Sequence, residues 1–291
     1  MNESIPQALL LIFMFIIGAM MGSFACCQAR RLHEKNLGKT YGHWSVCLHC
    51  GHRLKWYENI PLFSWLFLRG KCSKCGKKIG ASEIFAEVGT ALAFLALGTT
   101  ISFQWSVLEW SMFVVLLIGI VIMAILAIYD SLWKQLPNFL LILVNACAIL
   151  YFCLRIIGLC LRLFPPQSIM GISGAAGEVI NVLLAIGLLA GLYFLLYFFS
   201  HEKLVGAGDW ILGLALALFL SNWWLALVTL FIANFSASII ALPLLFHQKT
   251  KQIKKSNQKI RNTQIPFGPF LIFGFIVVWV LQTWLLKLVV F

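Results

Sequence analysis

Runs of about 20 apolar residues constrain this chain more than any other feature, because a helix of that length crosses a bilayer. Hydrophobic residues make up 61% of the 291 residues and charged residues only 11%. A soluble domain could not expose so much apolar surface without aggregating. Lipid also requires each backbone polar group to be paired within the spanning structure, which favours helices. We therefore expect an all-α polytopic membrane protein.

About eight transmembrane helices are expected, with a small cytoplasmic loop domain between the first and the second. The expected spans are residues 7–26, 84–101, 108–129, 139–160, 178–199, 209–221, 223–246 and 268–290. The number falls to six if the sixth and seventh form one re-entrant hairpin.

The net charge of +12 comes from two basic segments. Of the 22 Lys and Arg residues, 11 lie between Arg30 and Lys78 and six between Lys249 and Arg261. Both segments flank apolar runs, and basic loops of membrane proteins face the cytoplasm. Neither segment interleaves its basic residues with stacking aromatic residues, so we expect no nucleic-acid partner. With both loops inside, eight spans place both termini outside.

This topology gives three regions. Residues 1–26 are expected to form the first transmembrane helix, retained because no basic segment precedes its apolar run. Residues 27–83 form the cytoplasmic loop. Residues 84–291 form the membrane core, which includes a basic cytoplasmic loop at 247–265.

Four of the nine cysteines form two matching CxxC units in the cytoplasmic loop: Cys47, Cys50, Cys72 and Cys75. Each unit turns two thiolates towards one point, and two units complete a tetrahedral site for Zn²⁺. A disulfide pair is the alternative, but the loop faces the reducing compartment. Four thiolates leave no open position for water, so we expect the zinc to be structural.

Asp130 and Asp209 are the only aspartates, and each lies at the end of an apolar run. An ionisable residue at such a position indicates a functional site. The topology above brings both to the cytoplasmic face, where two close carboxylates would share one proton and act as a proteolytic dyad. The alternative is that each aspartate caps a helix or pairs with Lys134 or Lys203.

Five motifs in order resemble the type IV prepilin peptidases, the leader peptidases of type IV pilus, type II secretion and competence systems. They are Gly22-Ser23-Phe24, the stretch from Cys47 to Cys72 that contains Glu58-Asn59-Ile60-Pro61, Asp130 with Leu136-Pro137, Gly206-Ala207-Gly208-Asp209, and Ile265-Pro266-Phe267-Gly268-Pro269-Phe270. The resemblance covers most of the chain.

The resemblance implies two activities in the inner (cytoplasmic) membrane. The family cleaves the basic leader of prepilins or pseudopilins after glycine, then N-methylates the new terminus with S-adenosylmethionine. By this resemblance Asp130 and Asp209 are the aspartyl peptidase pair, and the four cysteines bind metal. Glu58, Glu83 or Glu87 is expected to matter for docking of the basic leader.

The chain departs from the family pattern at several positions, some of which adjoin the cytoplasmic loop. Cys26 replaces an asparagine, Leu48 a proline, and residues 79–84 an Ile-Ser-x-Arg-Tyr-Pro motif; Ile211 replaces a lysine. Methyl transfer is therefore less firmly implied than cleavage. Two other readings compete: an intramembrane protease of the presenilin and signal-peptide-peptidase type, and a non-enzymatic zinc-knuckle scaffold or transporter whose aspartates bind a cation.

Overall fold

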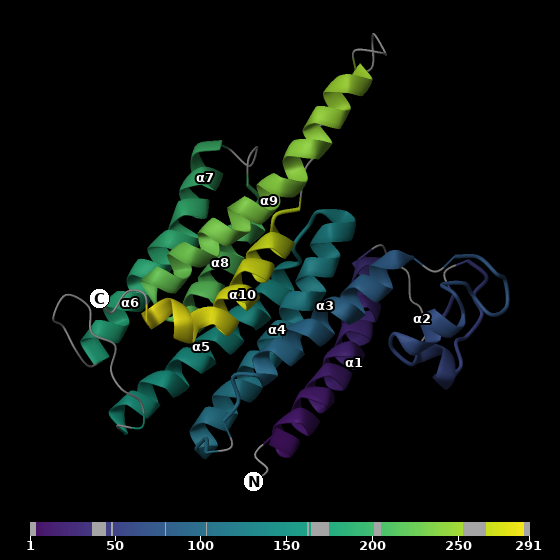
Figure 1. Ribbon diagram of the computed structural model, residues 1–291. Coiled ribbons are helices and arrows are strands. Elements are labelled where there is room, and N and C mark those ends of the chain that lie inside the picture. The colour runs from purple at the N-terminus through teal and green to yellow at the C-terminus, as the bar shows by residue number, and fades with distance from the viewer. Residues whose placement is uncertain are drawn as a thin grey trace. The chain divides into compact units, whose positions relative to one another are not determined.

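The computed structural model describes residues 4–36, 45–47, 49–78, 80–102, 104–161, 163, 175–200, 205–252 and 266–287. Helices dominate these residues (Figure 1). The described part has no named β-strand and contains only two isolated bridges, Val46 with Arg53 and Lys71 with Lys78. The chain divides into two compact units, residues 1–129 and 130–291, and each is described by itself.

The helices follow one another through both units without an intervening sheet. Unit 1 contains α1 (Ser4–Asn36), the 3-10 turn η1 (Trp56–Asn59), α2 (Phe63–Phe67), α3 (Ala81–Gly98) and α4 (Val107–Trp133) as far as Tyr129. Unit 2 contains the end of α4, α5 (Asn138–Cys160), α6 (Ala175–Ile186), the π-helical turn η2 (Gly187–Gly191), α7 (Leu192–Ser200), α8 (Ala207–Leu220), α9 (Trp223–Gln252) and α10 (Gly268–Lys287).

The helices confirm the expected multi-pass membrane protein. Within the described residues, six segments are long and apolar enough to cross a bilayer: Pro6–Lys35, Val107–Trp133, Asn138–Cys160, Ala176–Ser200, Trp223–Ala241 and Gly268–Leu286. The other two expected spans coincide with α3 and α8, which are 18 and 14 residues long. Each of the eight expected spans therefore corresponds to a helical segment of the structure.

Two helices extend beyond the boundaries expected from hydropathy. The first helix continues past residue 26 to Asn36, because the basic segment that follows the apolar run contains no glycine or proline to end it. Similarly, α9 continues to Gln252. The rest of the expected basic loop at 247–265, from residue 253 onward, lies outside the described residues.

In unit 1, α1 and α3 pack along each other. They approach closely at Gly22, where a Cβ atom would lie 2.6 Å from the Ala86 carbonyl oxygen and 2.7 Å from the Glu87 Cα. Only glycine permits backbones to approach so closely. Gly22 therefore lets the end of the first apolar run lie directly against the first turns of α3.

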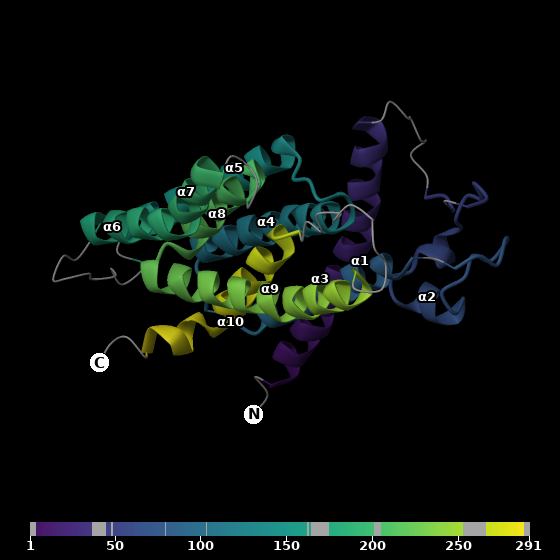
Figure 2. The ribbon, with the colours of Figure 1, turned by 90° about the horizontal axis from the view of Figure 1, so that it is seen from above.

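In unit 2, α8 is the central helix. It packs against α5, α6 and the π-helical turn, while α9 packs against α10. Figure 2 shows the same helices from above. A helix that is apolar on all sides is buried, and this applies to α8, in which Leu212 and Leu216 are fully buried. The short length of α8 is thus compatible with its position inside unit 2, where it packs against the longer segments Asn138–Cys160 and Ala176–Ser200.

Candidate functional site

Asp130 and Asp209 are both buried in unit 2, with 6% and 8% of their surfaces exposed. Asp130 lies in the last turn of α4, shortly before Pro137, which precedes and caps α5. Asp209 lies in the first turn of α8. The carboxylates are close enough for the charge on Asp130 to act on Asp209. Two residues 79 positions apart in sequence therefore share one buried environment.

One oxygen of each carboxylate accepts a backbone hydrogen bond. The Gly268 N–H at the start of α10 donates to Asp130 Oδ2 at 3.0 Å. The Gly206 N–H, just before α8, donates to Asp209 Oδ2 at 3.2 Å. Backbone donors fix a carboxylate without introducing a counter-charge, because an amide carries no net charge. The orientation of both carboxylates is therefore set by three helix ends.

Leu136 fills the space between these helix ends. A Cβ atom at Gly208 would lie 2.6 Å from Leu136 Cβ, and one at Gly268 would lie 3.5 Å from Leu136 Cδ2 and 2.9 Å from Asp130 Oδ2. Both positions are therefore too crowded for a larger residue without displacement of a neighbour. The two glycines allow the starts of α8 and α10 to reach the Asp130 region.

Tyr193 of α7 is a further polar residue in the surroundings of Asp209. Its side chain is buried, and the charge of Asp209 acts on it. Asn234 Nδ2 of α9 donates to the Tyr193 hydroxyl at 3.3 Å, and the Phe267 ring lies 5.3 Å from the Tyr193 ring. No sequence motif marks Tyr193, because its role depends on packing between distant helices.

The capping alternative is partly realised at Asp209, whose carboxylate accepts the N–H that precedes its own helix. The lysine alternative is not observed at Asp130: among the described residues, no ion pair joins it to Lys134. Lys203 lies outside the described residues. Capping alone does not explain why Asp130, at a helix C-terminus, is buried against Gly268.

The four cysteines of the loop form a second site, in unit 1. Their sulfur atoms all lie within 4.8 Å of one another. The Cys47 and Cys75 sulfurs are 3.9 Å apart, and those of Cys50 and Cys72 are 4.0 Å apart. Zn–S bonds of about 2.3 Å in a tetrahedron place sulfurs about 3.8 Å apart. The cluster could therefore hold a metal ion such as zinc, and these separations exceed a disulfide bond of about 2.05 Å.

The backbone of the knuckles already favours a thiolate at one position. The N–H groups of Cys75 and Lys74 lower the pKa of Cys72 to about 7. At Cys50 the His52 N–H lowers the pKa, but desolvation and the neighbouring thiols outweigh it and raise the value to about 11. Four sulfurs this close repel one another when ionised, and a divalent cation removes that repulsion.

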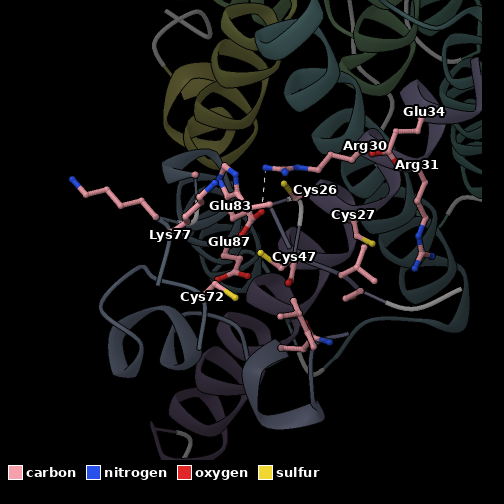
Figure 3. Close-up of a pocket in the computed structure, with 18 residues that line it drawn as sticks. Cys26, Cys27, Arg30, Arg31, Glu34, Cys47, Cys72, Lys77, Glu83 and Glu87 are labelled. Carbon is pink, nitrogen blue, oxygen red and sulfur yellow. Dashed lines mark ion pairs between the residues drawn. The ribbon is translucent and has the colours of Figure 1, made fainter. Parts of the chain in front are cut away.

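A cavity of about 180 Å³ opens beside the cysteine cluster, between α1, α3 and the loop (Figure 3). An ion pair between Arg30 and Glu83, 3.1 Å long, lies in it, and Arg30 also donates to the Ser82 hydroxyl. The side chains of Cys26 and Cys47 face the same space. The cavity thus offers a cation, a carboxylate and thiols.

The three glutamates expected to dock a basic leader all have intramolecular partners. Glu83 pairs with Arg30, and Glu87 Oε2 accepts the Leu62 N–H at 2.8 Å. Glu58 Oε2 accepts the Lys55 N–H at 2.7 Å and lies 3.6 Å from His52 Nε2. Glu58 and Glu87 are buried. All three carboxylates are thus engaged by partners within unit 1.

Comparison with known proteins identifies relatives of both units. A family model described as the bacterial peptidase A24 N-terminal domain matches residues 16–101. A prepilin leader peptidase/N-methyltransferase of Vibrio cholerae is 30% identical over 226 residues, covering 69% of this chain and 85% of the relative. No solved structure matches.

Two further relatives carry the same name. The prepilin leader peptidase/N-methyltransferase of Aeromonas hydrophila is 28% identical over 227 residues, covering 78% of this chain and 68% of its own length. That of Dichelobacter nodosus is 46% identical over 74 residues, covering 22% of this chain and 26% of the relative. Because the Vibrio cholerae relative is matched over most of its length, the chain belongs to the prepilin leader peptidase/N-methyltransferase family.

Proposed function

We propose that this protein is a membrane aspartyl endopeptidase that removes the leader of prepilins or pseudopilins at the cytoplasmic face of the inner membrane. The observation that carries the proposal is the shared buried environment of Asp130 and Asp209, each held by a backbone N–H. The names of the relatives support the substrate class.

In this mechanism the two carboxylates share a single proton, because two close negative charges cannot both persist at low dielectric. The ionised carboxylate accepts a proton from water, which attacks the scissile carbonyl carbon. The protonated carboxyl donates a hydrogen bond to the carbonyl oxygen and stabilises the tetrahedral intermediate. Collapse of the intermediate breaks the C–N bond as the leaving amine takes up a proton.

The backbone bonds have a defined part in this cycle. The Gly268 and Gly206 N–H groups engage Oδ2 of Asp130 and Asp209, which leaves Oδ1 of each residue to interact with water and substrate. The pair titrates as a unit, so the proton belongs to the dyad and not to one residue.

We also propose N-methylation of the new terminus with S-adenosylmethionine in the cavity of unit 1. The mixed charges there suit the methionine moiety of the methyl donor: Arg30 would hold its carboxylate and Glu83 its ammonium group. When bound, the donor supplies an electrophilic methyl group on sulfur. The cysteine cluster would hold zinc as a structural ion that fixes the loop beside the cavity.

Cleavage of a prepilin-like substrate in proteoliposomes tests the peptidase. Asp130→Asn and Asp209→Asn should each abolish cleavage, since asparagine keeps the size of aspartate but cannot exchange protons. Glu109→Gln is the matched control, because it also replaces a carboxylate by an amide, but in the first turn of α4. There the Glu109 carboxylate accepts the Ser106 N–H. If both asparagine variants still cleave, the dyad is wrong; if the wild-type protein itself does not cleave, a scaffold or cation-binding role gains support.

A further inference from the structure

The cytoplasmic loop carries a cluster of exposed apolar side chains that no part of the described unit covers. On the short helix α2, Phe63, Leu66 and Phe67 have exposed fractions of 62%, 68% and 81%. The preceding turn η1 adds Trp56 and Tyr57, and Ile60 follows that turn. Together we call these six the aromatic face: Trp56, Tyr57, Ile60, Phe63, Leu66 and Phe67. Exposed apolar side chains are expected on membrane helices, but here they lie on a loop.

The three residues of the aromatic face that lie on α2 have helical spacing. Phe63, Leu66 and Phe67 occupy positions i, i+3 and i+4 of α2 and so share one side of it. The backbone N–H groups of Ser64, Leu66 and Leu68 are bonded within the loop itself. A segment with one apolar side and satisfied backbone donors can enter the interface of a bilayer without leaving polar groups unpaired.

One hydrogen bond ties the start of α2 to α3, near the end of the first apolar run. The Leu62 N–H, immediately before α2, donates to Glu87 Oε2 of α3 at 2.8 Å. Glu87 lies opposite Gly22 of α1, at the end of the first apolar run. Helix α2 therefore begins level with the cytoplasmic edge of the first span, and not far out in the cytoplasm.

The charge of the loop suits an anionic surface. The described loop residues 45–78 include seven Lys and Arg residues, namely Arg53, Lys55, Arg69, Lys71, Lys74, Lys77 and Lys78, against a single carboxylate, Glu58. Glu58 is buried and bonded to the Lys55 N–H. Basic residues around an apolar aromatic patch are the composition of segments that bind anionic membranes.

We propose that the aromatic face is an interfacial anchor that inserts among anionic phospholipid headgroups of the leaflet where α1 ends. Trp and Tyr prefer the headgroup level, where the ring is partly apolar and the polar tip stays hydrated. Lys55, Arg69 and Lys71 flank the face and contact the phosphates. The anchor holds the zinc-knuckle loop, and with it the cavity of unit 1, flat on the bilayer. This inference depends on unit 1 alone and does not require the proposed peptidase.

Depth-dependent fluorescence quenching tests the anchor in the full chain. An environment-sensitive fluorescent amino acid replaces Phe67 in one protein and Lys74, an exposed residue of the second knuckle, in the other. Both are reconstituted in bilayers that contain phosphatidylglycerol and a lipid with a nitroxide near the headgroup. We expect several-fold stronger quenching at position 67 than at position 74. Equal quenching at the two positions, or none at 67, overturns the proposal.

The second part of the experiment varies the charge of the lipid and of the protein. Replacing phosphatidylglycerol by phosphatidylcholine should weaken quenching at position 67, and Arg69→Gln should lower the ratio of inserted to free loop by about fivefold in the anionic bilayer. If the reporter at position 67 is shielded from water equally in all lipids, and two copies of the protein crosslink through it, the aromatic face mediates self-association instead. A reporter shielded only after a prepilin is added would assign it to substrate. Either result rejects the lipid anchor.

Discussion

The backbone N–H of Gly268 donates to Asp130 Oδ2 at 3.0 Å, across 138 residues of sequence. This bond links the last turn of α4 to the start of α10 and is itself buried. It explains why the final helix begins with glycine, since a Cβ atom there would lie 2.9 Å from the same oxygen. The last helix of the chain thus takes part in orienting an aspartate of the candidate dyad.

Gly268→Ala should therefore lower the cleavage rate without preventing folding. The added methyl group displaces the Asp130 carboxylate, and misplacement of a reacting group by about 1 Å can cost about 100-fold in rate. Cleavage kinetics in proteoliposomes measure the effect. Gly89→Ala is the control, because no atom outside its own stretch of helix backbone lies within 4 Å of the Cβ position there. Unchanged kinetics in Gly268→Ala would show that the bond does not orient Asp130.

Gly208→Ala should reduce both stability and cleavage, because its methyl group would meet Leu136 Cβ and Cδ1 at 2.6 and 2.7 Å. Overpacking of this kind costs about 1–3 kcal/mol. Leu136→Gly removes both atoms, so the double variant should be less impaired than the two single changes added together. Thermal unfolding and cleavage assays on the wild type, the two single variants and the double variant give the coupling free energy between the two positions. Simple additivity would mean that Gly208 and Leu136 are not in contact.

Much of this organisation is predictable from hydropathy and spacing, and the exceptions have physical causes. The expected span 139–160 agrees closely with α5, because a proline before it and a long apolar run define both ends. The two CxxC units are local patterns, so their convergence could be foreseen. The Asp130–Gly268 bond and the position of Tyr193 depend on how distant helices pack. Hydropathy also does not mark the π-helical turn at Gly187–Gly191, since its composition remains apolar.

Removing a thiol from the cysteine cluster should release the metal. Cys72→Ser should reduce zinc from about one ion per chain to near zero and make residues 45–78 sensitive to protease, because a structural site contributes its binding energy to folding. Elemental analysis and limited proteolysis of protein purified without chelators measure both effects. Cys153→Ser is the control, since Cys153 is an exposed free cysteine of α5. Wild-type protein that contains no zinc would reject the structural site.

Glu58 should make the loop sensitive to acid. The Lys55 N–H, with a hydrogen bond from Ser73, lowers the pKa of this carboxyl below its usual value of 4.5. A lowered pKa means that the stabilisation is complete above the unfolded-state pKa and is lost as pH falls through the folded-state pKa. Glu58→Gln should therefore destabilise the loop at neutral pH and make little difference in strong acid. The protease sensitivity of residues 45–78 is measured against pH in the wild type and in Glu58→Gln, at a fixed zinc concentration. Parallel curves for the two proteins would contradict a stabilising role of the Glu58 carboxylate.

Cleavage and methylation should be separable through the Arg30–Glu83 pair, which is 3.1 Å long and lies in unit 1, whereas both aspartates lie in unit 2. Arg30→Gln should reduce methyl transfer by about 10-fold or more, because a charge-assisted hydrogen bond contributes about 1.5–3 kcal/mol. The same variant should leave leader cleavage near the wild-type rate.

Transfer of a labelled methyl group from S-adenosylmethionine to a mature pilin peptide isolates the second step, because that substrate needs no cleavage. The Asp130→Asn protein should methylate this peptide normally, whereas the Arg30→Gln protein should not. Lys74→Gln controls for the loss of one positive charge from the same loop, since Lys74 is exposed. If Arg30→Gln and Lys74→Gln methylate equally well, the methyl donor does not bind at the Arg30–Glu83 pair. The peptidase proposal would stand, because it rests on different residues.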